Sequence, residues 1–113
     1  MVSIEPMEPS VFVKTFGNSP FIRIVDFLIE SSMFDYELDE IFENAEVPSE
    51  IALPIWVELL ALNFVVHTRV LNGVPLYKLN NVNPVVQKLI DFDNALCWQA
   101  YESHAQITES MHN

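Results

Sequence analysis

Asn72 and Gly73 constrain the fold more strongly than any other pair of residues in this sequence. They lie between two runs rich in β-branched residues, FVVHTRV at 64–70 and VPLYKLN at 74–80. An Asn-Gly pair between such runs favours a two-residue turn of type I′, in which both turn residues adopt a positive φ. The sequence therefore predicts an antiparallel β-hairpin over this region.

Helical patterns surround the hairpin. Residues 18–32 predict a helix with Asn18 or Ser19 as N-cap and Pro20 at the first helical position, where its missing N–H costs nothing. Residues 36–45 predict a short second helix capped by Asp35, with acidic residues at its positive end. Before both helices, residues 11–17 are expected as a short strand or a docking arm.

Pro54 makes the third helix the least regular of the expected elements. A helix that began near Ser49 would lose one backbone hydrogen bond at Pro54, at a cost of about 3 kcal/mol. The less costly arrangement starts the regular helix at Leu53 and leaves residues 49–52 as a separate turn. We therefore expect a shortened or bent helix, ending at Asn63 in a left-handed cap.

A fourth and longer helix follows the hairpin. Asn83 is its expected N-cap and Pro84 its first residue, and apolar residues recur at helical spacing over 83–104. Trp98 and Tyr101 lie beyond the point where a core helix of a small domain could stop. Residues 105–113 are polar and are expected to be a frayed tail.

The order of these elements resembles that of the small winged helix-turn-helix transcription regulators of archaea and bacteria. The resemblance rests on NSPFIRIVDFLIES, FDYELDEIFENAEVP, LLALNFVVHTRVLNGVPLYKLN and NPVVQKLIDF, and it covers roughly residues 17–91. It implies a mainly α fold with a β-hairpin: a three-helix core, a wing and a long C-terminal helix. The expected parts are an N-terminal arm (1–16), the winged helix-turn-helix domain (17–82), a C-terminal dimerisation helix (83–104) and a tail (105–113).

The chain departs from that family where the DNA-reading helix would begin. Glu46 stands at the turn position that commonly carries glycine, and Pro48 stands in place of the usual Ser or Thr cap. The side chains then available for base contacts are Ser49, Glu50, Ile51 and Ala52. We therefore expect this helix not to read DNA in the usual way.

The charge of the chain sharpens this expectation. The net charge is -11, with five basic residues against sixteen acidic ones, and no Lys or Arg occurs between Arg23 and Arg69. Duplex DNA is densely anionic and is held mainly through Lys and Arg contacts. A protein with this balance starts at a disadvantage on DNA.

Two surfaces are therefore candidates for the functional site. In the first, the wing contacts DNA phosphates or the minor groove, as the family resemblance implies; its candidate residues are Ser49, His67, Arg69 and Lys78. The alternative for Arg69 and Lys78 is a solvated cross-strand pair, or a bridge to the acidic helices. In the second, an acidic helix face binds a basic protein; its candidate residues are Asp39, Glu40, Glu43, Glu46 and Glu50.

The C-terminal helix is the expected dimer interface. Its apolar residues lie on two sides, more than one small domain covers, and an isologous dimer would bury them. The candidate interface residues are Val85, Leu89, Phe92, Leu96 and Trp98. The alternative is that this helix folds back over Phe21, Phe27 and the N-terminal arm of its own chain.

The sequence offers little for catalysis. Its histidines and Cys97 lack the close spacings of zinc sites, the carboxylates lie on solvated helix faces, and two glycines are too few for a phosphate loop. We expect no enzyme activity, cofactor or metal, and a cytoplasmic protein, since the N-terminus does not resemble a signal peptide. The function expected is a homodimeric winged-helix transcription regulator that contacts DNA mainly through its wing, or else a winged-helix module that binds a basic protein partner.

Overall fold

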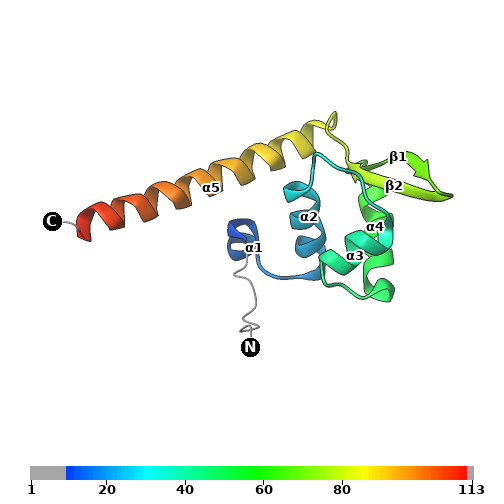
Figure 1. Ribbon diagram of the computed structural model, residues 1–113, viewed down its shortest axis with the longest axis horizontal. Helices are drawn as coiled ribbons and strands as arrows, with labels where there is room; N and C mark the ends of the chain where they lie inside the picture. Colours follow the sequence, from blue (N-terminus) through cyan, green and yellow to red (C-terminus); the bar gives the residue numbers. More distant parts are fainter. Residues whose placement is uncertain (1–9, 112–113) are drawn as a thin grey trace.

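The computed structural model describes the backbone of residues 10–111 and the side chains of residues 10–103. Its mainly helical architecture with one hairpin is the expected one, with one further helix at the start (Figure 1). The elements, in chain order, are α1 (Val11–Phe16), α2 (Pro20–Glu30), α3 (Leu38–Asn44), α4 (Ser49–Ala61), β1 (Val65–Leu71), β2 (Val74–Leu79) and α5 (Pro84–Met111).

The start of α2 confirms the cap expected there. Ser19 is the N-cap, its Oγ accepts a hydrogen bond from the Ile22 N–H at 3.2 Å, and Pro20 occupies the first helical position. The cap expected for α3 is wrong. Glu37, not Asp35, precedes the helix, and Glu40 Oε1 accepts from the Glu37 N–H at 3.3 Å. Asp35 is thereby free to bond elsewhere, with consequences for the hairpin.

Both α3 and α4 are followed by a residue in the left-handed region. Glu46 follows α3 with φ 59°, and the Val47 N–H donates to the Phe42 carbonyl at 3.0 Å. Asn63 follows α4 with φ 60°, and the Phe64 N–H donates to the Leu59 carbonyl at 3.0 Å. This six-to-one bond is the Schellman pattern of helix ends. The left-handed cap expected at Asn63 is confirmed.

The expected interruption of α4 at Pro54 is wrong. The helix runs unbroken from Ser49 to Ala61 with Pro54 inside it. The Ala52 N–H donates to the Pro48 carbonyl at 2.9 Å, so the first turn is regular. Packing of α4 on the core compensates for the backbone N–H that Pro54 lacks. Ala52, Trp56 and Leu59 are buried on one face of the helix.

The hairpin forms as expected, with Asn72 and Gly73 both at positive φ (52° and 80°) between β1 and β2. The register shifts between His67 and Arg69, so Thr68 is an extra residue in β1, as in a β-bulge. A bridge from the α2–α3 loop adds to the other edge of β2. There Tyr36 and Tyr77 exchange both backbone hydrogen bonds, at 2.9 and 2.8 Å.

Residues 11–16, expected as a strand or arm, form helix α1 instead. The Ser10 side chain accepts from the Val13 N–H and caps this helix, and Phe12 is buried against α2 and α5. The core is continuous across α1 to α5; its largest fully buried side chains are Ile24, Ile41, Leu59 and Val86.

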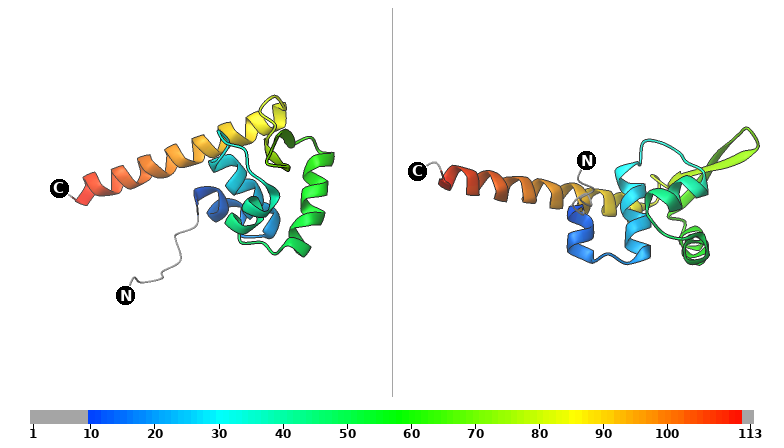
Figure 2. Two further views of the ribbon diagram at one scale, coloured as in Figure 1. Left: turned by 45° about the vertical axis from the view of Figure 1, so that its right-hand side comes forward. Right: turned by 60° about the horizontal axis from the view of Figure 1, so that its bottom comes forward.

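Helix α5 begins on the core and then leaves it. Asn83 Oδ1 accepts from the Val85 N–H at 2.8 Å, which supports its expected capping role, and Val86 is buried. The helix runs on to Met111, past the end expected at residue 104, and its second half projects from the body (Figure 2). About 28 residues of helix span about 42 Å, longer than a small domain can cover.

Candidate functional site

The sequence resemblance leads us to expect α4 as the reading helix, and the outward face of α4 carries no cation. Glu50, Val57 and Glu58 are exposed, on the side opposite the buried Trp56. Ser49, the first residue of α4, is exposed too, at the end of the helix that lies away from β1. Neither α3 nor α4 contains Lys or Arg.

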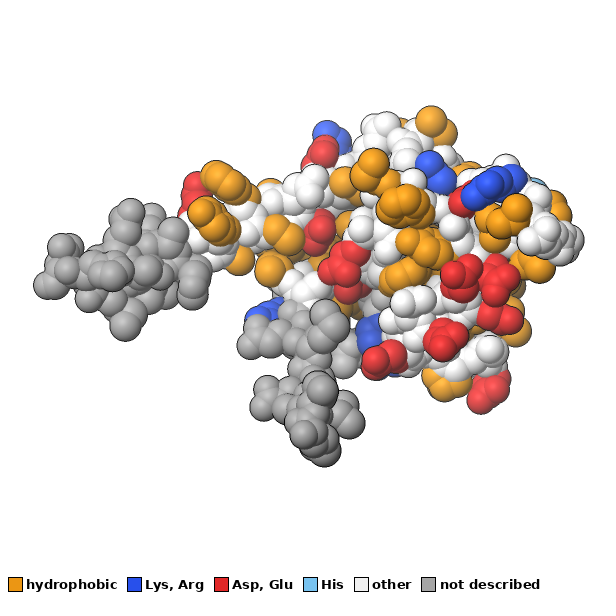
Figure 3. Space-filling model, in the orientation of Figure 1, with side chains coloured by type: hydrophobic (Ala, Val, Ile, Leu, Met, Phe, Trp, Pro, Cys, Tyr) orange, Lys and Arg blue, Asp and Glu red, His pale blue; other side chains and the backbone are white. Residues whose placement is uncertain are grey.

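The acidic candidates lie together on this side of the molecule. All five are exposed, and Figure 3 shows acidic side chains gathered over α3 and α4. They come from α3, from the left-handed turn after it and from the first turn of α4: Asp39, Glu40, Glu43, Glu46 and Glu50. These five candidate residues thus form an exposed group of carboxylates.

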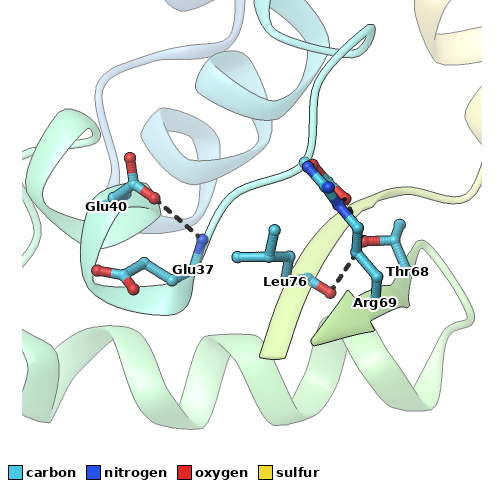
Figure 4. Close-up of polar contacts among 6 residues, drawn as sticks. Glu37, Glu40, Thr68, Arg69 and Leu76 are labelled. Carbon is cyan, nitrogen blue, oxygen red and sulfur yellow. Dashed lines mark hydrogen bonds and ion pairs between the residues drawn. The ribbon is translucent and has the colours of Figure 1, made fainter. Parts of the chain in front are cut away.

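Arg69 does not offer a free charge to a partner. Its Nε and Nη2 donate to the two carboxylate oxygens of Asp35 at 2.9 and 3.1 Å, a bidentate pair. Thr68 Oγ1 donates to the same Asp35 carboxylate at 2.6 Å. Figure 4 shows Thr68 and Arg69 side by side at this point on β1. The pair ties the hairpin to the α2–α3 loop.

The hydrogen bonds from Arg69 and then Thr68 lower the pKa of Asp35 to about 2. The same pairing raises the pKa of Arg69. The Asp35 side chain is 16% exposed and that of Arg69 is 59% exposed, so the guanidinium is partly open to solvent although it is neutralised. Bidentate Arg–carboxylate pairs are among the stronger charge-assisted contacts.

The other two hairpin candidates are not partners of Arg69. Lys78 lies opposite Val66 in the register and Arg69 lies opposite Leu76, so the expected cross-strand pair of the two cations is wrong. The alternative bridge from Arg69 to an acidic residue forms, but to the loop aspartate rather than to α3 or α4. His67 is exposed and its ring stands edge-on to Tyr77 at 5.6 Å. His67, Arg69 and Lys78 thus lie on the same hairpin but do not pair with one another.

The structure divides the five dimer candidates of α5 into two groups. Val85, Phe92 and Trp98 are exposed, whereas Leu89 and Leu96 are half-buried. The first half of α5 packs on its own chain, as the fold-back alternative expected: Phe92 meets Phe16 at 5.6 Å between ring centroids. Farther out, Trp98 is 62% exposed and stacks on Tyr101 at 5.6 Å. Phe16 and Tyr101 were not among the candidates.

A cavity of about 230 Å³ lies where α1, α2 and α5 meet. Each residue that lines it is apolar: Phe12, Phe16, Phe21, Ile22, Val25, Phe64, Val85 and Leu89. Nearby, burial raises the pKa of Asp26 and of Asp93, and Asp26 adds repulsion at Asp93.

Comparison with known proteins leaves the family open. No protein-family profile matches the chain, and no curated protein matches it. Among solved structures, the crystal structure of Sso10a-2, a DNA-binding protein from Sulfolobus solfataricus, aligns with a TM-score of 0.48 at 10% identity. The alignment covers 77% of this chain and 90% of that chain. Such a distant likeness fixes neither fold family nor function. Among the described residues, none of the helices has the length and apolar character to cross a membrane.

Proposed function

We propose that this protein is a homodimeric regulator of the winged-helix class whose α3–α4 face binds a basic protein instead of DNA. The order of helices and the hairpin supports the winged-helix part of this proposal. The hairpin then corresponds to the wing, α3 and α4 to the helix-turn-helix, and α5 to the dimerisation helix.

The observation that carries the proposal is the character of the face where such a protein would meet DNA. Every exposed ionised side chain of α3 and α4 is a carboxylate. Phosphates repel such a face, and each counterion-releasing contact with DNA needs a Lys or Arg, which α3 and α4 lack. A basic protein segment gains from the same carboxylates, which steer it to this face and fix its orientation.

The exposed side of α5 supports the homodimer. Lys88, Phe92, Ala95, Trp98 and Glu102 follow one another along this side at helical spacing, and all are exposed. An antiparallel pair of α5 helices with Ala95 on the two-fold axis would set Phe92 against Trp98 of the second copy. The same register would set Lys88 against Glu102 of the second copy. The small Ala95 side chain would let the helices approach closely there.

A second candidate function keeps DNA contact at the wing. Arg69 is still more than half exposed, and His67 and Lys78 lie on the same hairpin. In this case Arg69 would have to exchange the Asp35 carboxylate for a phosphate. Removing Asp35 would then strengthen DNA binding.

Fluorescence anisotropy with random-sequence duplex DNA, over a series of salt concentrations, separates the two functions. We expect no binding above background even at low salt, both for the wild-type protein and for Asp35→Asn. Affinity that falls steeply with salt, with a slope flattened by Arg69→Ala and Lys78→Ala, would instead establish the wing as a DNA contact. The second result would contradict the proposed function.

A further inference from the structure

Helix α4 carries an apolar stripe on the side that faces away from the core. Leu53 and Val57 are 48% and 65% exposed, and Pro54 and Ala61 are exposed beside them. Their spacing of one, four and eight residues places them along one side of the helix. The stripe is about 12 Å long from Leu53 to Ala61.

The stripe is not part of the face that α4 packs into the core. Ala52, Trp56 and Leu59 already supply the buried face of α4, on the opposite side. A helix of a small domain normally presents charged or polar residues outward. Apolar residues gathered at helical spacing on the outer face of a helix instead mark a surface that a partner covers.

Carboxylates of α4 lie at one end of the stripe and along one of its borders. Glu50 lies one turn before Pro54 on the same side, Glu58 follows Val57, and both are exposed. An apolar surface with carboxylates beside it is complementary to an amphipathic segment whose apolar side is bordered by Lys and Arg.

We propose, on the basis of the function above, that the stripe Leu53, Pro54, Val57 and Ala61 seats an amphipathic helix of the basic partner. Anchors at helical spacing on that helix pack along the stripe, and its flanking cations face Glu50 and Glu58. A second copy of this chain is a poor occupant because none of its described helices contains more than one Lys or Arg to face Glu50 and Glu58. DNA is excluded because its phosphates repel these carboxylates, and because the stripe offers no donor to a base edge or phosphate.

The test uses the full chain and two labelled synthetic peptides of about five helical turns. The first peptide places leucines on one side and lysines along both borders. The second keeps the lysines but replaces the leucines with glycine and serine, so that it is basic without an apolar side. Anisotropy titrations compare the wild-type protein with Val57→Ser and, as a matched control, Val82→Ser. Val82 is 81% exposed in the turn before α5, so both substitutions remove the same side chain from the surface.

We expect the amphipathic peptide to bind better than the second peptide. Val57→Ser should weaken it about tenfold, since burying one valine is worth roughly that factor, whereas Val82→Ser should leave it unchanged. Equal binding of both peptides, with no effect of Val57→Ser, would overturn the proposed role of the stripe. The proposed binding of a basic protein to the α3–α4 face would remain. No binding of either peptide would overturn both. Loss of self-association in Val57→Ser, followed by sedimentation, would make the stripe an interface between copies and would also overturn the proposal.

Discussion

The guanidinium of Arg69 meets both oxygens of Asp35, and the bulge at Thr68 adds a third bond to the same carboxylate. The one arginine of the hairpin is therefore neutralised within the fold before any partner arrives. Its role is to anchor the hairpin to the α2–α3 loop. A phosphate would have to compete with an intramolecular partner that is always present.

Replacing Asp35 with asparagine should remove an acid-sensitive part of the stability. The pKa of Asp35 is about 2 in the folded protein and about 3.9 in an unfolded chain. A lowered carboxyl pKa stabilises the fold above the unfolded value, and this contribution disappears as the pH falls from about 4 to about 2. The wild-type and Asp35→Asn proteins should therefore differ in urea midpoint at pH 5 and converge near pH 2.

Asp39→Asn serves as the control for that experiment. It removes an equal charge from α3 but does not touch the Arg69 pair. It should keep the difference in urea midpoint between pH 5 and pH 2 that the wild-type protein shows. The same difference in urea midpoint between the wild-type and Asp35→Asn proteins at every pH would contradict this role of the Asp35–Arg69 pair.

Single residues also show how far local sequence reasoning reaches. Ser19 before Pro20, Asn63 at the end of α4 and Asn72-Gly73 in the hairpin were predictable because each depends on its own backbone geometry. The pairing of Asp35 with Arg69 was not predictable. An aspartate before a helix looks the same in sequence whether its carboxylate caps that helix or binds a distant arginine. Asp35 and Arg69 lie 34 positions apart in the chain but are in direct contact in the fold.

At the scale of elements, α4 shows tertiary packing outweighing a local rule. Pro54 removes the donor to the Glu50 carbonyl, yet the helix stays continuous because Ala52, Trp56 and Leu59 are fixed in the core. Local propensity favoured a break at this point. The spacing of Leu53, Val57 and Ala61 is visible in the sequence, but spacing alone does not tell which side of a helix faces the core.

Replacing Pro54 with alanine should stabilise the protein. The substitution restores an N–H donor to the Glu50 carbonyl, and the exposed site leaves no cavity. After allowing for the greater freedom of the unfolded chain, the free energy of unfolding should rise by about 2 kcal/mol. Urea denaturation measures this change.

Pro20→Ala is the comparison for Pro54→Ala, because Pro20 stands at the first helical position, where its missing donor has no partner. It should leave the free energy of unfolding nearly unchanged or lower it slightly. A gain in Pro20→Ala as large as that in Pro54→Ala would show that the missing hydrogen bond in α4 is not the cause.

At the scale of the whole molecule, α5 extends well beyond the body that its first half helps to build. A helix alone in water is only marginally stable, so the proposed pairing of α5 would also stabilise the projecting half. Periodicity predicted the helix and its start, but the division between core and exposed faces depends on where α1 packs. That contact became visible only in three dimensions, since residues 11–16 were expected as a strand or arm.

Sedimentation equilibrium tests the proposed pairing of α5. We expect a dimer for the wild-type chain and a shift toward monomer in Trp98→Ser. Lys88→Glu should weaken the dimer and Glu102→Lys in the same chain should restore it, because the two positions face each other only in the antiparallel register. Met33→Ser, at a site that is 86% exposed and distant in sequence from α5, is the control. A Lys88→Glu defect that Glu102→Lys deepens would contradict this register.

The central claim is that the α3–α4 face binds a basic protein segment and not DNA, and backbone amide shifts of ¹⁵N-labelled protein test it most directly. We would add the lysine-bordered amphipathic peptide to one sample and duplex DNA to another. We expect the peptide to shift amides of α3 and α4 around Glu43, Glu50 and Val57, and DNA to shift none. Shifts confined to His67, Arg69 and Lys78 on adding DNA, with none from the peptide, would contradict the account and assign the function to the hairpin.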